Sequence, residues 1–149
     1  MYDLLIKNAE VFYQDSLTKV DIAISNGKII KIEKDIKESD SAKVIKADHL
    51  LALPGGIDSH VHISQPSGPD IEMADDFISA TKSAAAGGNT FVIPFALQNR
   101  GESIRTVVQN YHELAKGNCY IDYSFHLIIS EASPKILGQE LPALIKDGY

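Results

Sequence analysis

The sequence predicts an α/β protein in two parts: an all-β segment over residues 1–49 and the first part of a parallel α/β barrel over residues 50–149. Two observations carry this prediction. The first part consists of short, β-branched runs that alternate between apolar and polar residues, as half-buried strands do. From Leu50 onward, strand-like runs alternate with amphipathic stretches at helical spacing, which is typical of β/α units around a parallel sheet.

The all-β segment predicts short strands over residues 2–7, 10–13, 19–24, 28–33 and 43–46. Asn26-Gly27 lies between two of these runs and is the strongest short signal for a tight hairpin. Such a hairpin would place Ile22 and Ile24 against Ile32 and one of the two isoleucines at 29 and 30. We expect this segment to form part of a small β-structure of its own.

The second part begins with a short apolar segment, Leu50–Leu53, which Pro54-Gly55-Gly56 interrupts. Asp75 or Asp76 can cap a following helix, and Gly87-Gly88 can end it. The next strand is almost continuously apolar, as buried parallel strands are. The expected elements are a helix over 77–86, a strand over 90–96, a helix over 102–116, a strand over 121–129 and a short helix over 138–146.

His60 and His62 form an H-x-H pair near the end of the strand that follows Gly56. Side chains of a strand alternate between its faces, so both imidazoles should point to the same side. Two converging neutral imidazoles suit a borderline metal such as zinc. A strand whose alternate polar positions are histidines is the other interpretation. Asp58 shares their face, and either holds an imidazole through a hydrogen bond or serves the strand terminus.

Composition excludes several classes of function. The net charge of −6 offers no basic patch and argues against a nucleic-acid partner. The single cysteine, Cys119, cannot form an internal disulfide, and we expect a small buried residue there rather than a nucleophile. No apolar run approaches the length of a membrane span, and the first residues do not read as a signal peptide. We therefore expect no membrane partner and a cytoplasmic protein.

Several strings together resemble the dihydropyrimidinase/hydantoinase branch of the cyclic amidohydrolase superfamily. They are PGGIDSHVH at 54–62, ADDF at 74–77, AAGGNT at 85–90 and CYIDYSFH at 119–126, the last similar to the C-D-Y-x-x-H string of that branch. The string VIPFALQ at 92–98 is more similar to fungal dihydropyrimidinases than to bacterial hydantoinases. The resemblance implies a metal-dependent (β/α)8 TIM barrel, with residues 1–49 as the N-terminal half of a β-sandwich. Since a complete barrel takes about 250 residues, it also implies an N-terminal fragment with the first three βα units.

The resemblance further implies a zinc enzyme with two divalent metal ions, bridged by a carboxylated lysine beyond residue 149. His60 and His62 match the pair that binds the more buried ion; the other ligands and the catalytic aspartate have no match within the chain. We therefore expect no catalytic residue here and no activity of the fragment alone. The complete protein is expected to be a homotetramer that opens small cyclic ureides, 5,6-dihydropyrimidines or hydantoins, in pyrimidine catabolism.

Other interpretations remain open at this point. The H-x-H pair is equally typical of allantoinase-type and dihydroorotase-type enzymes, and non-catalytic dihydropyrimidinase-related assembly proteins keep the same barrel. The fragment could also be a product without activity of its own. His126 is expected to be a packed or hydrogen-bonded barrel histidine rather than a ligand, His49 and His112 to be surface residues, and Tyr149 to be structural. The loop over 64–74 should overhang the pocket, with Ile71 or Met73 facing a substrate ring.

Overall fold

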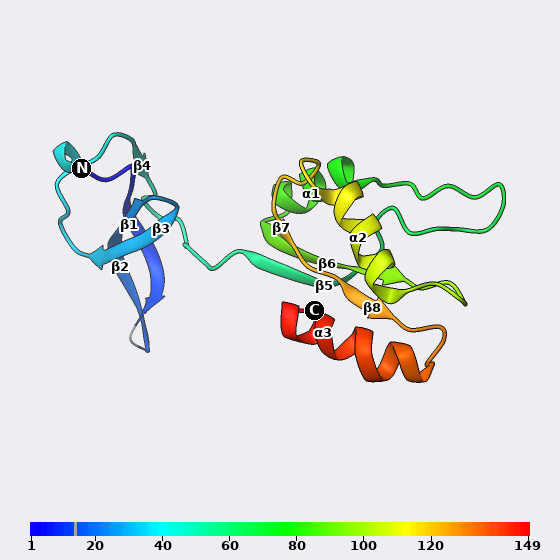
Figure 1. Ribbon diagram of the computed structural model, residues 1–149. Helices are drawn as coiled ribbons and strands as arrows, with labels where there is room; N and C mark the ends of the chain where they lie inside the picture. The colour runs from blue at the N-terminus through cyan, green and yellow to red at the C-terminus, as the bar shows by residue number, and fades with distance from the viewer. Residues whose placement is uncertain (14) are drawn as a thin grey trace. The chain divides into compact units, whose positions relative to one another are not determined.

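The computed structural model describes residues 1–13 and 15–149 and divides into two compact units, Met1–Pro54 and Gly55–Tyr149 (Figure 1). The division predicted from the sequence, after residue 49, lies a few residues earlier. Within the described ranges, the strands form two four-stranded sheets, one in each unit. The assignment of the units to half of a sandwich and to the first three βα units stays a prediction.

The first unit is a sheet with the strand order β3-β2-β1-β4. Its strands are β1 (Leu4–Tyr13), β2 (Ser16–Ser25), β3 (Lys28–Glu33) and β4 (Val44–Lys46), with a 3-10 turn, η1 (Glu38–Asp40), between the last two. The sequence predicts two strands where the structure has the single strand β1. The interruption that suggested two strands is a register shift between Ile6 and Ala9, where Asn8 takes a φ of 61°.

The predicted hairpin between β2 and β3 is confirmed. Asn26 and Gly27 have φ values of 51° and 70°, and positive φ at both central residues defines the turn that matches the twist of paired strands. Ile22 pairs with Ile32, and Ile24 pairs with Ile29. The hairpin thus follows from its two turn residues and the alternating isoleucines on either side.

A buried carboxylate at Asp21 joins three segments of the first unit. Its side chain accepts hydrogen bonds from Lys7 Nζ at 2.5 Å, from the backbone N–H of Asn8 at 2.9 Å and from the backbone N–H of Ile36 at 2.9 Å. Burial raises the pKa of Asp21, but the hydrogen bonds and the charge of Lys7 outweigh it, so the pKa lies below its ordinary value. Asp21 therefore remains ionised in the folded unit.

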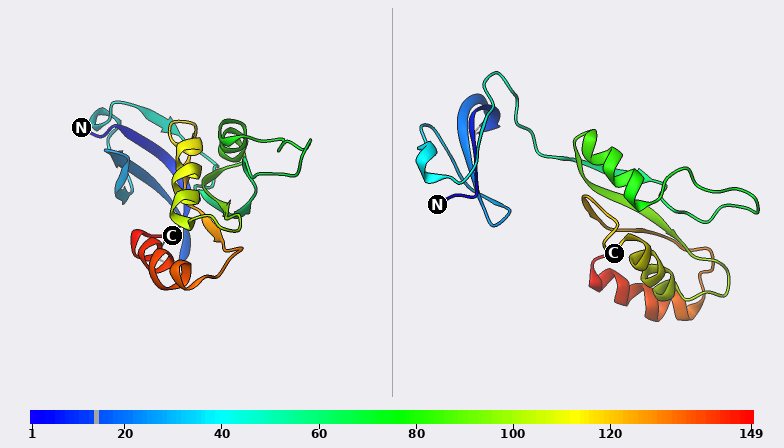
Figure 2. Two further views of the ribbon diagram at one scale, coloured as in Figure 1. Left: turned by 45° about the vertical axis from the view of Figure 1, so that its right-hand side comes forward. Right: turned by 90° about the horizontal axis from the view of Figure 1, so that it is seen from above.

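The second unit alternates strands and helices along a parallel sheet of order β5-β6-β7, with β8 also paired to β6 (Figure 2). The predicted strand over 121–129 is interrupted at Ser124 and Phe125, where the buried Phe125 ring turns into the core. The elements are β5 (Gly56–Val61), α1 (Phe77–Ala86), β6 (Asn89–Leu97), α2 (Ile104–Ala115), β7 (Asp122–Tyr123), β8 (His126–Ile128), the π-helical turn η2 (Ile136–Glu140) and α3 (Leu141–Asp147).

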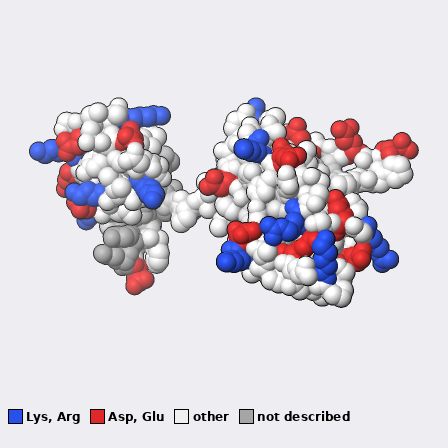
Figure 3. Space-filling view, in the orientation of Figure 1, with Lys and Arg blue, Asp and Glu red and all other residues white. Residues whose placement is uncertain are grey.

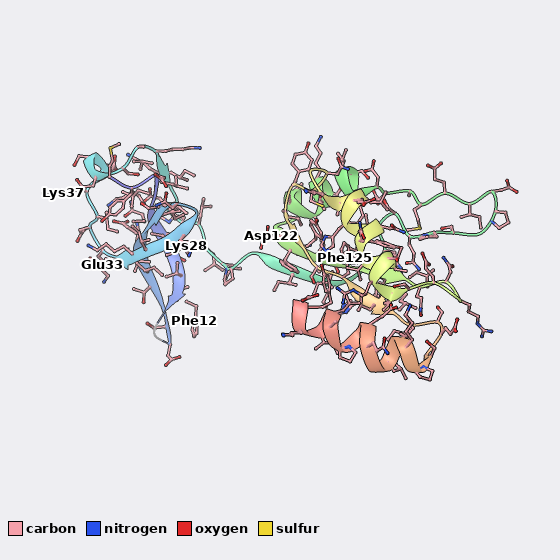
Figure 4. All side chains as sticks on the ribbon, in the orientation of Figure 1. Phe12, Lys28, Glu33, Lys37, Asp122 and Phe125 are labelled. Carbon is pink, nitrogen blue, oxygen red and sulfur yellow. The ribbon has the colours of Figure 1, made fainter. Side chains whose placement is uncertain are left out.

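The two faces of this sheet differ in burial. On β6, Val92, Pro94 and Ala96 are buried, whereas Phe95 and the other alternate residues are only half-buried. The helices cover the first face, which we call the closed face, and the opposite one is the open face. Figure 4 shows Phe125 within the core on the closed side. That core comprises Ile63, Phe77, Val92, Ala96, Ile104, Val107, Val108, Tyr111, Ala115, Phe125, Ile136 and Leu144.

Two residues that the helical periodicity assigns to the core are not part of it. Ile78 of α1 is 46% exposed, and Leu114 of α2 is 48% exposed. Buried Thr81 takes a core position on α1 instead, since its hydroxyl donates to the Phe77 carbonyl and accepts the backbone N–H of Tyr120. A satisfied hydroxyl can therefore replace an apolar residue on a buried helix face.

Two local sequence features determine the β5–α1–β6 unit: a glycine before β5 and a capping residue at the start of α1. A methyl group at Gly55 would lie 2.2 Å from side-chain atoms of Thr90, so only glycine fits where β5 starts beside β6. Asp76 caps α1: its carboxylate accepts the backbone N–H of Ser79 at 2.8 Å, and Ser79 Oγ in turn accepts the backbone N–H of Asp76 at 3.2 Å. Of the two predicted cap residues, Asp76 is confirmed.

Candidate metal centre

The two histidines of the H-x-H pair lie side by side at the carboxyl end of β5. His60 is within the strand and His62 follows its last residue, Val61. Their ring centroids are 5.6 Å apart with the ring planes at 69°. Ile63, at the alternate position, is buried in the core. Both imidazoles are thus presented on the open face, at the end of the sheet where β/α proteins place their active sites.

Phe95 of β6 is a shared aromatic surface beneath these histidines. Its ring centroid lies 4.7 Å from that of His60, in an edge-to-face arrangement, and 5.0 Å from that of His62, in a stacked one. On its other side His126 of β8 lies 5.2 Å away. The sheet therefore gathers three imidazoles around one phenylalanine, two from the end of β5 and one from β8.

The hydrogen bonds of the cluster leave one lone pair of His62 free. His62 Nδ1 contacts Gln65 Oε1 at 2.5 Å, so Nδ1 is the donor and the lone pair of Nε2 is available to a metal. The Asp58 carboxylate accepts the backbone N–H of His60 at 3.1 Å. This contact serves the end of the strand; a contact between Asp58 and an imidazole stays a prediction.

His126 is hydrogen-bonded across the sheet. Its Nε2 donates to the Ser59 carbonyl at 2.8 Å, which joins β8 to β5. The sequence-based expectation of a hydrogen-bonded barrel histidine agrees with this contact. Ser59 directly precedes His60, so the bond reaches the backbone of the histidine pair.

The loop between β5 and α1 encloses a hollow that reaches the histidine pair only through Gln65. Ile71 and Met73, the two candidates for contact with a substrate ring, both line it together with Gln65, the partner of His62. Every charged residue between His62 and Phe77 is acidic: Asp70, Glu72, Asp75 and Asp76. Figure 3 shows acidic residues on this projecting loop, at the right of the view. Contact with a substrate stays a prediction.

Two other histidines lie apart from this centre. His49 belongs to the first unit and is exposed. The expectation of a surface position for His112 is wrong: it is half-buried, its Nε2 contacts the Tyr149 hydroxyl and its Nδ1 the Tyr123 hydroxyl at 3.4 Å. Helical spacing places His112 beside the α2 stripe but does not reveal that two tyrosines cover it. Tyr149 thus has a structural contact, as expected.

Cys119 does not have the environment of a nucleophile. Burial raises the pKa of its thiol, which keeps it protonated near neutral pH. Across residues 1–13 and 15–149, no group of three or more His, Cys, Asp and Glu side chains is placed to hold a metal ion. His60 and His62 fit zinc by donor type but supply only part of a ligand set, because a zinc site uses at least three protein ligands.

The fold and the site together define a class: a parallel β/α protein with a histidine pair at the carboxyl end of its first barrel strand. Comparison with known proteins refines this class. No family model matches the chain. It is 41% identical to the D-hydantoinase of Geobacillus stearothermophilus, over 96% of this chain and 30% of that protein. It is 36% identical to the dihydropyrimidinase of Dictyostelium discoideum, over 97% of this chain and 28% of that protein.

Solved structures agree with the sequence comparisons. A D-hydantoinase crystal structure matches 99% of this chain and 31% of its own, with a TM-score of 0.90 and 37% identity. The dihydropyrimidinase of Brevibacillus agri matches with the same TM-score at 35% identity. The chain is therefore a homologue of hydantoinases and dihydropyrimidinases, and the predicted resemblance and fold class are confirmed. The particular likeness to fungal dihydropyrimidinases stays a prediction.

The chain spans about 30% of the length of the curated relatives that it matches. No helix within the described residues is long and apolar enough to cross a membrane.

Proposed function

We propose that the complete protein is a metal-dependent cyclic amidohydrolase that opens 5,6-dihydropyrimidines or hydantoins. The observation that carries this proposal is the His60–His62 pair on the open face, in a chain homologous to hydantoinases over nearly its whole length. Intact histidines favour an enzyme over a non-catalytic relative. The chain covers about 30% of those relatives, and the proposal takes it as their N-terminal part, with the remaining ligands elsewhere in the complete protein.

In this proposal His60 and His62 would bind a divalent ion, zinc; the complete centre would hold two such ions, with a carboxylated lysine from another part of the protein as a shared ligand. When bound, such ions supply a hydroxide near neutral pH and polarise the amide carbonyl. The chain's own residues hold the ligands in place. Gln65 accepts the Nδ1 proton of His62 and leaves Nε2 to face the ion, while Phe95 packs against both rings.

The loop over residues 64–76 provides one wall of the substrate site. Its hollow combines apolar side chains, Ile71 and Met73, with the polar Ser64 and Gln65. A cyclic ureide has an apolar edge and a polar amide edge, which this combination suits. The acidic charge of the loop favours a neutral ring over an anionic one. We further propose a cytoplasmic homotetramer, in keeping with the soluble composition of the chain.

The test uses the complete protein, purified with its metal. Metal analysis of the wild type should find zinc, and dihydrouracil or hydantoin should be hydrolysed. A His60→Ala, His62→Ala double variant should lose both the metal and the activity, whereas His49→Asn, in the exposed turn of the first unit, should keep both. Asparagine suits that position because His49 has a φ of 62°.

Unchanged metal content in the double variant would contradict the metal proposal. Turnover of dihydroorotate or allantoin in place of dihydrouracil and hydantoin would contradict the proposed substrate class. The fragment of 149 residues should be inactive on dihydrouracil, since it offers two ligands of a shared centre. Turnover by this fragment that His60→Ala abolishes would show that argument to be wrong.

A further inference from the structure

The strand ladder between β5 and β6 is irregular where the histidine pair begins. Asp58 pairs with Val92 and Val61 pairs with Pro94, so the register shifts within the intervening segment of β5. The peptide unit between Ser59 and His60 therefore lies in a part of the sheet where a regular ladder does not hold it.

Side chains hold this peptide unit at both of its polar ends. The Ser59 carbonyl accepts a hydrogen bond from His126 Nε2 at 2.8 Å, and the His60 N–H donates to Asp58 Oδ1 at 3.1 Å. The first bond crosses from β8 to β5, over a sequence separation of 67 residues. Because a peptide unit is planar, holding both of its polar ends also holds the Cα of His60, from which the imidazole extends.

The His126 ring also closes the aromatic cluster. It packs against Phe95, which in turn contacts His60 and His62. His126 thus reaches the pair in two ways: its Nε2 acts on the backbone that carries His60, and its ring supports the phenylalanine beneath both imidazoles. Of these two, only the hydrogen bond depends on a donor at the position of Nε2.

We propose that His126 is a positioning residue for the His60–His62 pair, which acts through its Nε2–H bond to the Ser59 carbonyl and not as a metal ligand. This inference rests on the proposed function, since it assumes that the pair binds a metal. The bond holds β5 where its register with β6 shifts, and it orients His60 before any ion arrives. Losing it should weaken zinc binding about tenfold, the lower end of the effect of removing groups that orient a metal ligand.

Three variants of the complete protein separate the donor from the ring. His126→Gln places an amide N–H near the position of Nε2, whereas His126→Asn is too short to reach it. His126→Phe keeps an aromatic ring and removes the donor. The zinc dissociation constant is measured by competition with a chelator, the ligand geometry by the visible spectrum of the cobalt-loaded protein, and the fold by thermal unfolding of the metal-free protein.

We expect His126→Phe and His126→Asn to bind zinc about tenfold more weakly and to change the cobalt spectrum, and His126→Gln to restore both. Wild-type affinity in the asparagine variant would overturn the proposal, as would equal losses in the glutamine and asparagine variants. If His126→Phe does not fold, the difference in zinc affinity between His126→Gln and His126→Asn still tests the proposal. Failure of the proposed function would look different: the His60→Ala, His62→Ala variant would then bind zinc as the wild type does.

Discussion

The two units of the chain use different means to hold their sheets. In the first unit the buried apolar clusters are small, and the ionised Asp21 joins Lys7, Asn8 and Ile36 in its interior. In the second unit, one large apolar core lies between the helices and the closed face of the sheet. The comparison teaches that a charged group holds the interior of the first unit, whereas a large apolar core holds the second.

The difference also separates stability from chemistry within the second unit. The closed face carries the core, and the open face carries His60, His62 and Phe95. Substitutions on the closed face should change stability without changing the affinity of the folded protein for a metal. Substitutions of the histidines should do the reverse, because exposed imidazoles bury little area.

The largest effect is expected from Phe77→Ala. Phe77 is 2% exposed and packs against Tyr123 and Phe125, so its removal leaves a cavity in the core. We expect a loss of about 3–5 kcal/mol in the second unit. The neighbouring Ile78→Ala, at a half-exposed position, should cost much less. Hydrogen exchange followed by mass spectrometry reports each unit separately; equal losses in the two variants would contradict the assignment of the core.

The second prediction concerns the buried carboxylate of the first unit. Asp21→Asn leaves Lys7 without a charged partner in a largely buried position, and removal of one member of a buried pair costs about 3–5 kcal/mol. The exposed pair Lys19–Asp48 is the matched control, and Asp48→Asn should cost about 0–1 kcal/mol. Exchange protection should fall in the peptides of the first unit and stay unchanged in those of the second.

The pH dependence of the first unit follows from the same group. The pKa of Asp21 is lower in the folded unit than in the unfolded chain, so its contribution is complete above the ordinary aspartate range. That contribution is lost as the pH falls through the lowered pKa of the folded state. The wild type should therefore lose exchange protection in its first unit on acidification. The Asp21→Asn variant, already weakened at neutral pH, should lose little further protection as the pH falls. If Asp21→Asn keeps the full pH dependence of the wild type, the Asp21 carboxylate is not its origin.

Much of this architecture could be predicted from the sequence because it depends on local signals. Asn26-Gly27 determines a hairpin, Asp76 a helix start, and the alternation after Leu50 a parallel sheet. The H-x-H spacing also placed His60 and His62 on one face. These features involve residues close together in the chain, where periodicity and capping rules apply.

What the sequence did not reveal depends on contacts between distant segments. The role of Asp21 arises from Lys7 and Ile36, and that of His126 from Ser59, 67 residues away. His112 lies beside the stripe of an amphipathic helix, yet Tyr149 covers it. The shift of register beside Pro94 likewise needs both strands.

The third prediction tests the close approach of β5 and β6. Gly55→Ala places a methyl group 2.2 Å from Thr90 side-chain atoms and 2.7 Å from its Cβ, so the strands must shift. We expect a loss of about 1–3 kcal/mol, confined to the second unit. Gly68→Ala is the control, since its nearest neighbour, Ile71 Cδ1, lies 4.0 Å away. Thr90→Gly should relieve the clash, so the Gly55→Ala, Thr90→Gly double variant should lose less stability than the sum of the two single variants. Strictly additive losses would exclude a clash between these two residues.

The smallest effect is expected at the cap of α1 and refines the comparison, because it gives one helix of the second unit a pH dependence of its own. The Ser79 backbone N–H holds the pKa of Asp76 below its ordinary value, so the cap is complete above the usual aspartate range and weakens as the pH falls through the lowered pKa. Asp76→Ala should speed amide exchange in the first turn of α1, whereas Asp76→Asn, which keeps an acceptor, should leave it nearly unchanged at neutral pH. The asparagine variant should also lose the acid sensitivity of that turn. Because Asp76 is exposed, the change should stay within α1 and leave the Phe77 core protected. Loss of protection throughout the second unit would show that the cap supports the core, and would remove the contrast between the buried Asp21 and the exposed Asp76.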